Sequence, residues 1–485
     1  MAPGRNWSGA ARRWAPLALL TLLALVARNR AEAADVEDAR VEPVVYDQRL
    51  VTPVFSARRI PQTLQAPLAA AALRPAIDAV VAASPPDSCL VVLDDGRTLE
   101  DRSGERSLIP ASNEKIISTW AALNLLGSTT RFRTTVRADT APLNGVVEGN
   151  LYLVGGGDPF LTTDNWWSQY QELDGRTRTR LEDLADSVVA AGVRTVTGAV
   201  VGDETYFDAQ RVGPWAERLI ESRQSGPLSA LAVNEGYVQW PAIFEGTFRP
   251  RVPSLDPPTD AARVFGELLT ARGVTVGGPL AGVAPAAAVE VAVIDSPPLI
   301  DIVTHVNSYR DNFGAEVLLK HLGRQHSGIG STVSGAEAAT TFAAQSGLPM
   351  SGVIIADGSG LSEANIVTCR FFAALLELAG EDSELVKSFS IGGRRGSLLG
   401  RWVDSPVAGQ VYAKTGTLND VSALTGVVNS VSDPETSLVF SYLVNGELVG
   451  QTDTVRGLQT PLVEALAKYP DAPALDVLAP SAPTR

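Results

Sequence analysis

Two short lysine-containing motifs, far apart in the chain, constrain this sequence more than any other feature. The first is Ser112-Asn113-Glu114-Lys115 and the second is Lys414-Thr415-Gly416-Thr417. Only five of the 40 basic side chains are lysines, and two of those five lie in these motifs. Arginine keeps its proton under nearly all conditions, whereas a desolvated lysine can lose one and act as a base. Lysine at these two places therefore indicates a chemical requirement, and a serine nucleophile would supply one.

The first motif is predicted to open a helix. Apolar residues recur at helical spacing from Ile116 to Leu126, and Gly127 provides a stop. Residues three apart share a helix face, so Lys115 is expected beside Ser112, where burial or a second cation would lower its pKa. The amine could then take the serine proton, and backbone N–H groups at the first turn would favour the developing negative charge. Alone the pattern is weak, because a capping serine with an exposed lysine has the same spacing.

The second motif is predicted to lie on the first of three successive strands, at 410–418, 422–428 and 437–444. Lys414 and Thr415 could bind a substrate carboxylate, and Gly416 would let a backbone approach closely. The substrate peptide would then lie along this strand as an extra edge. The alternative is an ordinary strand with an exposed lysine. Both motifs in this order, one at a helix start and one on a strand, are typical of active-site serine D,D-peptidases and β-lactamases.

Several further segments narrow the resemblance. From about residue 75 to 470 the chain resembles the low-molecular-mass class C penicillin-binding proteins, which are D-Ala-D-Ala carboxypeptidase/endopeptidases of peptidoglycan. The segments that carry this resemblance are Gly155-Gly156-Gly157-Asp158-Pro159, Val200-Val201-Gly202-Asp203, Pro227-Leu228-Ser229-Ala230-Leu231, Asp357-Gly358-Ser359-Gly360-Leu361-Ser362 and Gly393-Arg394-Arg395-Gly396-Ser397-Leu398. The long insert between the nucleophile and the middle motif separates this family from ordinary β-lactamases.

The resemblance implies an α/β (α+β) fold and acyl transfer. A transpeptidase/β-lactamase-like domain, with an antiparallel sheet flanked by helices, would be built from both ends of the chain around a β-rich inserted domain. Ser112 would attack the penultimate D-alanine of a peptidoglycan stem peptide, with the N–H groups of Ser112 and Thr417 as oxyanion hole. β-Lactams would acylate Ser112 as covalent inhibitors. No metal or organic cofactor is implied.

The middle motif departs from the family pattern. The family has Ser-x-Asn, whereas this chain has Arg310-Asp311-Asn312. In the family the serine relays a proton and the asparagine binds the substrate amide and the lysine. Arginine has no readily transferable proton, so Arg310 would instead lower the pKa of Lys115 or hold an anion. Ser308 is a second candidate for the missing hydroxyl, although its spacing is wrong for direct replacement.

Arg310 in place of the middle-motif serine also favours an alternative function. The protein would then be a catalytically weakened, wall-binding pseudoenzyme of the same fold. Substrate preference is open as well. Asp158, whose family counterpart is associated with the amino group of the peptide side chain, is retained, whereas Glu363 stands where the family commonly has an arginine.

The chain is predicted to be exported. Arg5, Arg12 and Arg13 precede an apolar run and Ala31-Glu32-Ala33, the order of a secretory signal cleaved after residue 33. An uncleaved anchor is the alternative, but the apolar run is too short to span a membrane comfortably. No stable span is therefore expected after cleavage, and the expected location is the cell envelope, periplasmic or extracellular. We expect an extended lead-in at 34–72, the transpeptidase-like domain at 73–130 and 293–470, the insert at 131–292 and a disordered tail at 471–485.

Charge and the remaining reactive side chains exclude other classes. The net charge of −14 argues against nucleic acid as a ligand. The three histidines, His305, His321 and His326, have no zinc-ligand spacing. Cys89 and Cys369 could pair in an oxidising compartment, but two separately buried thiols are the favoured expectation.

Overall fold

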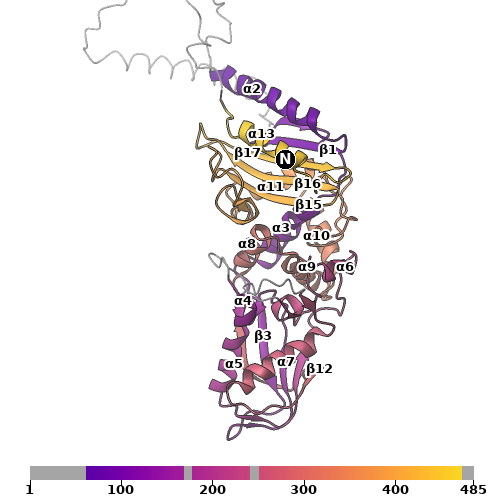
Figure 1. Ribbon diagram of the computed structural model, residues 1–485, viewed down its shortest axis with the longest axis vertical. Coiled ribbons are helices and arrows are strands. Elements are labelled where there is room, and N and C mark those ends of the chain that lie inside the picture. Colours follow the sequence, from indigo (N-terminus) through magenta and orange to yellow (C-terminus); the bar gives the residue numbers. More distant parts are fainter. Residues whose placement is uncertain (1–61, 169–176, 241–250, 472–485) are drawn as a thin grey trace, which may run out of the picture. The chain divides into compact units, whose positions relative to one another are not determined.

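Strands from both ends of the chain meet in one six-stranded antiparallel sheet (Figure 1). The computed structural model describes residues 62–168, 177–240 and 251–471. The strand order is β14-β15-β16-β17-β1-β2. The strands are β14 (Ser390–Ile391), β15 (Val411–Leu418), β16 (Val421–Asn429), β17 (Ser437–Asn445), β1 (Ser88–Asp94) and β2 (Arg97–Arg102). The three successive strands predicted from the sequence are therefore confirmed, and β17 joins them to β1.

Helices cover both faces of this sheet, because its central strands are apolar on both sides. On β16, Ala423 and Val427 enter one core while Leu424 and Val428 enter the other, as the two-residue period of a strand requires. The first core contains α3 (Glu114–Leu126), α8 (Leu299–Ser308), α9 (Asn312–Ser327), α10 (Thr332–Gln345) and α11 (Cys369–Ala379). The second contains α2 (Gln62–Ala83) and α13 (Asp453–Leu466). The predicted α/β (α+β) fold class, with an antiparallel sheet flanked by helices, is confirmed.

Helix α2 corrects the expected extended lead-in at 34–72. It begins at Gln62 and runs through Pro67 and Pro75. Its alanine-rich sequence is a strong helix former, and Leu73, Ile77 and Val80 are buried at helical spacing in the same core as α13. Burial of this apolar stripe stabilises the helix although Pro67 and Pro75 each lack a backbone N–H donor.

A second sheet, of order β12-β9-β5-β3-β13, lies in the segment between α3 and α8. It consists of β12 (Pro279–Ala281), β9 (Val200–Asp203), β5 (Leu151–Val154), β3 (Arg133–Ala138) and β13 (Val289–Asp295). Helices α5 (Leu181–Ala190) and α7 (Pro257–Thr270) share its core. Asn144 and Gly145 form a tight turn, since both residues have positive φ and flanking backbone groups bond across it.

Short elements complete the described chain. The strand pairs are β4 (Val146–Val147) with β8 (Thr195–Val196), β6 (Leu161–Thr162) with β7 (Thr179–Arg180), and β10 (Tyr237–Gln239) with β11 (Val252–Pro253). The short helices are α4 (Asp164–Trp167), α6 (Arg218–Glu221) and α12 (Glu384–Lys387).

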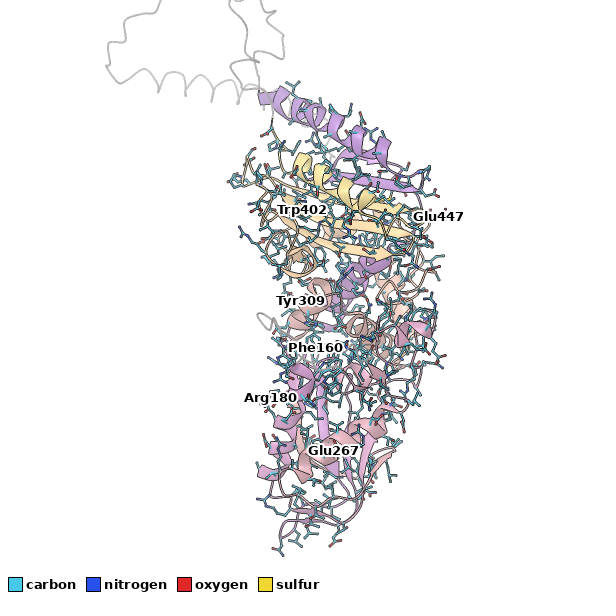
Figure 2. All side chains as sticks on the ribbon, viewed as in Figure 1. Phe160, Arg180, Glu267, Tyr309, Trp402 and Glu447 are labelled. Atoms are coloured by element: carbon cyan, nitrogen blue, oxygen red, sulfur yellow. A yellow bond between two sulfur atoms is a disulfide. The ribbon has the colours of Figure 1, made fainter. Side chains whose placement is uncertain are left out.

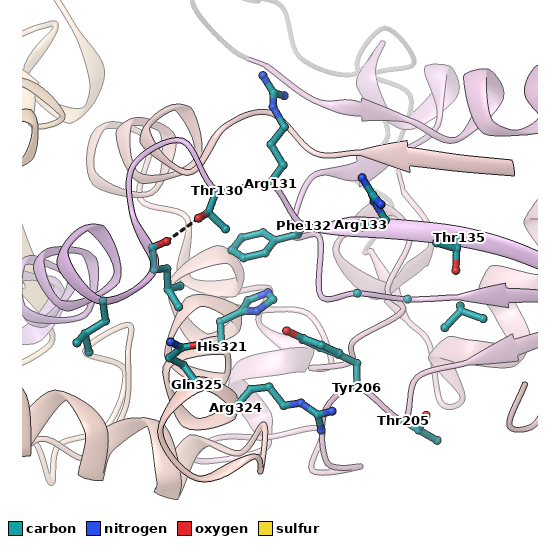
Figure 3. Close-up of a pocket in the computed structure, with 15 residues that line it drawn as sticks. Thr130, Arg131, Phe132, Arg133, Thr135, Thr205, Tyr206, His321, Arg324 and Gln325 are labelled. Atoms are coloured by element: carbon teal, nitrogen blue, oxygen red, sulfur yellow. Dashed lines mark hydrogen bonds between the residues drawn. The ribbon is translucent and has the colours of Figure 1, made fainter. Parts of the chain in front are cut away.

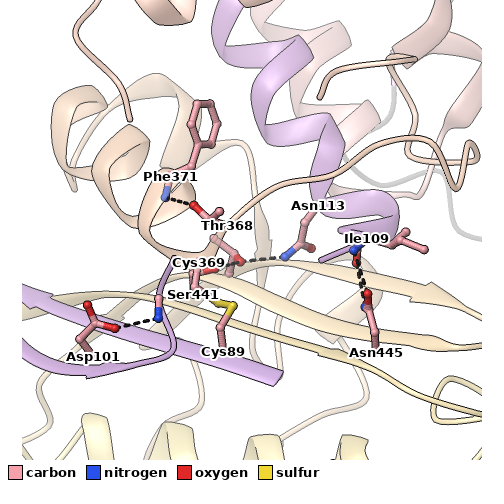
Figure 4. The surroundings of a disulfide bond; sticks show 11 residues. Cys89, Asp101, Ile109, Asn113, Thr368, Cys369, Phe371, Ser441 and Asn445 are labelled. Carbon is pink, nitrogen blue, oxygen red and sulfur yellow. Dashed lines mark hydrogen bonds between the residues drawn. A yellow bond between two sulfur atoms is a disulfide. The ribbon is translucent and has the colours of Figure 1, made fainter. Parts of the chain in front are cut away.

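Cys89 and Cys369 form a disulfide, so the expectation of two separate thiols is wrong (Figure 4). Cys89 lies on β1 and Cys369 begins α11, and their Cα atoms are 5.9 Å apart. The sequence separation of 280 residues hid this contact, because only the packing of α11 on the sheet brings the two positions together. The bond fastens the first strand of the sheet to a helix from the other end of the chain.

The predicted signal at 1–33, most of the lead-in and the tail beyond residue 471 lie outside the described residues. Within the described ranges, no helix combines the length and apolar character needed to cross a membrane. The same part of the chain contains no group of three or more His, Cys, Asp or Glu side chains placed to hold a metal ion.

Candidate active site

Ser112 stands in a tight turn that two glycines hold in place. It occupies a 3-10 turn, Ala111–Asn113, directly before α3. Ala111 has a φ of 47°, a left-handed conformation that is uncommon for a residue with a side chain. A Cβ on Gly360 would lie 1.9 Å from the Ala111 carbonyl oxygen, and one on Gly416 would lie 2.6 Å from that of Pro110. The glycine of the Lys-Thr-Gly motif thus allows β15 to pack against the serine turn.

The Lys115 amine makes three hydrogen bonds, and one of them is to Ser112. The distance from Nζ to Ser112 Oγ is 3.2 Å, and that to Asn312 Oδ1 is 2.6 Å. Nζ also donates to the carbonyl oxygen of Ser359. The Asn312 amide is oriented by its other end, where Nδ2 donates to the Gln224 carbonyl oxygen at 2.6 Å. The predicted trio of serine, lysine and asparagine is therefore brought together by direct contacts.

These contacts orient the lone pair of a neutral lysine. The Ser359 carbonyl and the Asn312 amide oxygen can only accept hydrogen bonds, so they require two N–H groups from Lys115. A neutral amine has two N–H groups and one lone pair. Its lone pair is then directed at the third neighbour, the Ser112 hydroxyl, which is the arrangement a general base needs.

Burial lowers the pKa of Lys115 to about 8. The side chain is fully inaccessible to solvent, which disfavours the charged form, and the nearby Arg310 cation acts in the same direction. Asp357, Glu316 and Asp311 oppose this shift by favouring the ammonium form. A useful fraction of the amine is therefore neutral near neutral pH.

Three buried acids lie around Lys115, and the sequence analysis assigned none of them a role. They are Glu114, Glu316 and Asp357, all fully buried, and burial raises the pKa of each. Glu316 accepts hydrogen bonds from the Ser359 N–H and hydroxyl, so it fixes the segment whose carbonyl binds Lys115. A sequence signal existed for Glu316, because it follows Asn312 by four residues on one helix face.

Arg310 has an unusual backbone conformation, and its exposed side chain makes no hydrogen bond or ion pair with the other described residues. Its φ is 64°, in the left-handed region that arginine rarely adopts. The next residue, Asp311, caps α9 by accepting from the Gly314 N–H at 2.8 Å. Ser308 does not replace the missing hydroxyl, because it is buried and donates to the Ser388 carbonyl oxygen. Arg310 thus occupies the middle-motif position, and Ser308 supplies no hydroxyl there.

Lys414 lies on β15, and its side chain is buried, so it is not an exposed cation. Its Nζ donates to the Thr415 carbonyl oxygen at 3.0 Å and forms no ion pair within the described residues. Burial, and then the charges of Lys115 and Arg310, move its pKa well below the ordinary lysine value. A bound substrate carboxylate would compensate for these like charges.

The outer edge of β15 is open beside the motif. Strand β14 pairs with β15 only at Tyr412 and Ala413. From Lys414 to Leu418, β16 is the sole partner of β15 among the described strands. This edge offers unpaired backbone groups to a peptide that binds as an additional strand.

Asp158 makes no hydrogen bond to Ser112, Lys115 or Asn312. It is buried, accepts from the Phe160 N–H at 2.8 Å, and has its pKa raised to about 6 by burial. Phe160 packs edge-on against His305 of α8, and Tyr309 packs against the same ring, in the region between the two sheets (Figure 2). The loop of Asp158 is thereby attached to the helix that leads into Arg310. Glu363 is exposed.

Cavity size does not identify this site. A cavity of about 630 Å³ lies at the C-terminal ends of α3 and α9, where Phe132, His321 and Tyr206 gather beside Arg324 (Figure 3). Burial lowers the pKa of His321 to about 4, and its Nε2 donates to the Gly157 carbonyl oxygen. Among the described residues, no serine, cysteine or lysine lines that cavity. A second cavity, of about 370 Å³, is lined by Arg310 and by the Thr415-Gly416-Thr417 strand.

Comparison with known proteins gives a consistent family. The D-Ala-D-Ala carboxypeptidase 3 (S13) family matches residues 64–247 and 245–469. A D-alanyl-D-alanine carboxypeptidase of Actinomadura sp. is 30% identical over 435 residues, covering 74% of this chain and 78% of that protein. A carboxypeptidase of Mycobacterium tuberculosis is 29% identical over 365 residues, covering 72% and 74%.

The fold also matches a solved structure. Penicillin binding protein 4 of Haemophilus influenzae superposes with a TM-score of 0.69 at 20% identity. The match covers 81% of this chain and 99% of that protein. At this identity the likeness supports the arrangement of the sheets and helices.

Proposed function

This chain belongs to the D-Ala-D-Ala carboxypeptidase 3 (S13) family, and from that premise we propose that it is a serine-type hydrolase of peptidoglycan stem peptides that works through an acyl-enzyme on Ser112. The observation that carries the proposal is the set of three Lys115 contacts, which leaves the lone pair of the neutral amine facing Ser112 Oγ. A structural lysine would have no need of this arrangement.

The chemistry follows in two balanced steps. Ser112 Oγ attacks the carbonyl carbon of the penultimate D-alanine while its proton passes to Lys115. The carbon–nitrogen bond then breaks, the proton goes to the leaving amine, and D-alanine departs. Water next attacks the ester, with Lys115 as base, and regenerates the serine. The N–H groups of Ser112 and Thr417 are proposed to stabilise the oxyanion in both steps.

Substrate binding is proposed along the open edge of β15. A peptide paired antiparallel to this strand places its scissile carbonyl near Thr417 and its terminal residue toward Thr415. Lys414 and Thr415 then face the terminal carboxylate, and Asn312 faces the peptide amide. Asp158 is proposed to bind the amino group of the peptide side chain, as the resemblance implies.

The absence of the middle-motif serine changes the route of the proton. Because Arg310 cannot relay one, Lys115 is proposed to return the proton to the leaving amine itself. β-Lactams are proposed to acylate Ser112 and to leave slowly, since the family includes penicillin-binding members. A substrate of this class places the protein in the cell envelope.

Release of D-alanine tests this proposal. The purified protein is incubated with a pentapeptide stem ending in D-Ala-D-Ala, and free D-alanine is quantified. We expect release that is lost in Ser112→Ala and in Lys115→Met. Release that persists in Ser112→Ala would contradict the serine assignment. Acylation by penicillin without release of D-alanine would favour the weakened, wall-binding alternative.

A further inference from the structure

The second cavity has more positive charge than a D-alanine leaving group requires. Three arginines line it, Arg310, Arg401 and Arg456, together with the hydroxyl-bearing residues Ser397, Thr415 and Thr417. None of the described residues that line it is acidic. In a chain with a net charge of −14, three guanidinium groups around a cavity of about 370 Å³ form a local cationic site.

The arginines are held toward the cavity without strong ion pairs. Arg401 donates to Gln459 Oε1 at 2.8 Å and stacks on the Trp402 ring. Burial and the neighbouring Arg456 charge lower the pKa of Arg401 to about 10, so it remains charged at neutral pH. Arg456 contacts the exposed Asp453 at 3.4 Å, a surface pair that contributes little. Like charges without a buried counterion are an arrangement that a bound anion relieves.

Arg310 also lines this cavity. Its guanidinium makes no hydrogen bond or ion pair with another residue in the described part of the chain. Its left-handed backbone is strained for a residue with a side chain, and such strain is typically retained at functional positions. An exposed, unpartnered arginine in a strained conformation at a cationic cavity is poised to meet an anionic ligand.

The position of the cavity relates it to the leaving group. In a substrate paired antiparallel to β15, the residue after the scissile bond lies toward Thr415, whose hydroxyl is 3.0 Å from Ser397 Oγ. A leaving D-alanine brings one carboxylate and a methyl group, which accounts for one anion among three guanidiniums. A second negative group on the same residue would offset more of this positive charge.

We propose that this cavity selects substrates whose leaving residue carries a second carboxylate, with Arg310 as the residue that determines the selection. This inference rests on the proposed hydrolysis at Ser112 and names its preferred substrate class. Arg310, at the middle-motif position, then does not relay a proton but binds acidic leaving groups.

Paired synthetic peptides test the proposal. Acylated tripeptides ending in D-Ala-D-Glu and D-Ala-D-Gln differ only in charge, and one ending in D-Ala-D-Ala reports basal hydrolysis. We expect kcat/KM for D-Glu to exceed that for D-Gln about tenfold, mainly through KM, as for one charge-assisted contact. Arg310→Asn, which tolerates the left-handed backbone, and Arg456→Gln should each reduce this ratio toward one.

The control is Arg394→Gln, an exposed arginine outside the cavity, which should keep the tenfold ratio. Equal kcat/KM values for the two peptides, or a ratio unchanged in Arg310→Asn, would overturn the inference while leaving the hydrolase intact. If none of the three peptides is hydrolysed, the proposed function is refuted, and this inference with it.

Discussion

The basicity of Lys115 gives a quantitative prediction for the rate of acylation by penicillin. Only the neutral amine can take the Ser112 proton, so the rate should follow the neutral fraction and rise with pH. With a pKa of about 8, that fraction is about 1% at pH 6, about 9% at pH 7 and about 90% at pH 9. The second-order rate constant should therefore increase roughly ninetyfold between pH 6 and pH 9 and then level off.

The charges around Lys115 determine whether a substitution shifts this dependence of the acylation rate to higher or lower pH. Arg310 lowers the pKa of Lys115, so Arg310→Asn should shift the rising limb to higher pH with the same plateau. Asp357, Glu316 and Asp311 favour the ammonium form. Glu316 is itself a buried acid with a raised pKa, so its titration could also produce a rise of the rate with pH. The variant Glu316→Gln removes that titration and leaves the titration of Lys115. A limb that persists in Glu316→Gln belongs to Lys115.

Stopped-flow acylation with a fluorescent penicillin provides the measurement, because the penicillin carboxylate does not titrate between pH 6 and pH 9. Arg394→Gln is the charge control, since it removes an exposed arginine that does not shift Lys115. A rate constant that is flat or falls across this range would refute the assignment of Lys115 as the base.

Three further predictions concern other parts of the structure. Lys115→Arg should slow acylation by about 10²–10⁴-fold at pH 8, because a guanidinium does not deprotonate there; an intact rate would contradict the base assignment. Gly416→Ala should lower the thermal midpoint by the equivalent of about 1–3 kcal/mol, since the new Cβ lies 2.6 Å from the Pro110 carbonyl oxygen, whereas Gly278→Ala, with open space around it, should not. Replacing both Cys89 and Cys369 by alanine should reduce unfolding free energy by up to about 5 kcal/mol in urea titrations, because the bond closes a loop of 280 residues; no change would argue against the bond.

Local patterns predicted the helix and strands that carry the two lysine motifs. Period-two and helical spacing located β15, β16 and β17 and helix α3 within a few residues. The three-residue spacing of Ser112 and Lys115 predicted their contact, which the structure has at 3.2 Å. These features depend on neighbours in sequence, which is why the sequence was sufficient.

Features that depend on distant partners were missed or wrongly predicted. The proline-containing helix α2 forms because Ile77 and its neighbours are buried on the sheet, which no local propensity reports. The disulfide between Cys89 and Cys369 and the acid Asp357 beside Lys115 depend on the same long-range packing. The close approach of Gly416 to Pro110 likewise gives the glycine a structural reason that the motif alone did not reveal.

Intact-protein mass spectrometry after incubation with a penicillin tests the central claim most directly. The contacts of Lys115 predict one covalent adduct of the mass of the intact penicillin, located on Ser112 and absent from Ser112→Ala. An unmodified mass at saturating penicillin, or an adduct that remains in Ser112→Ala, would contradict the assignment of Ser112 as the nucleophile.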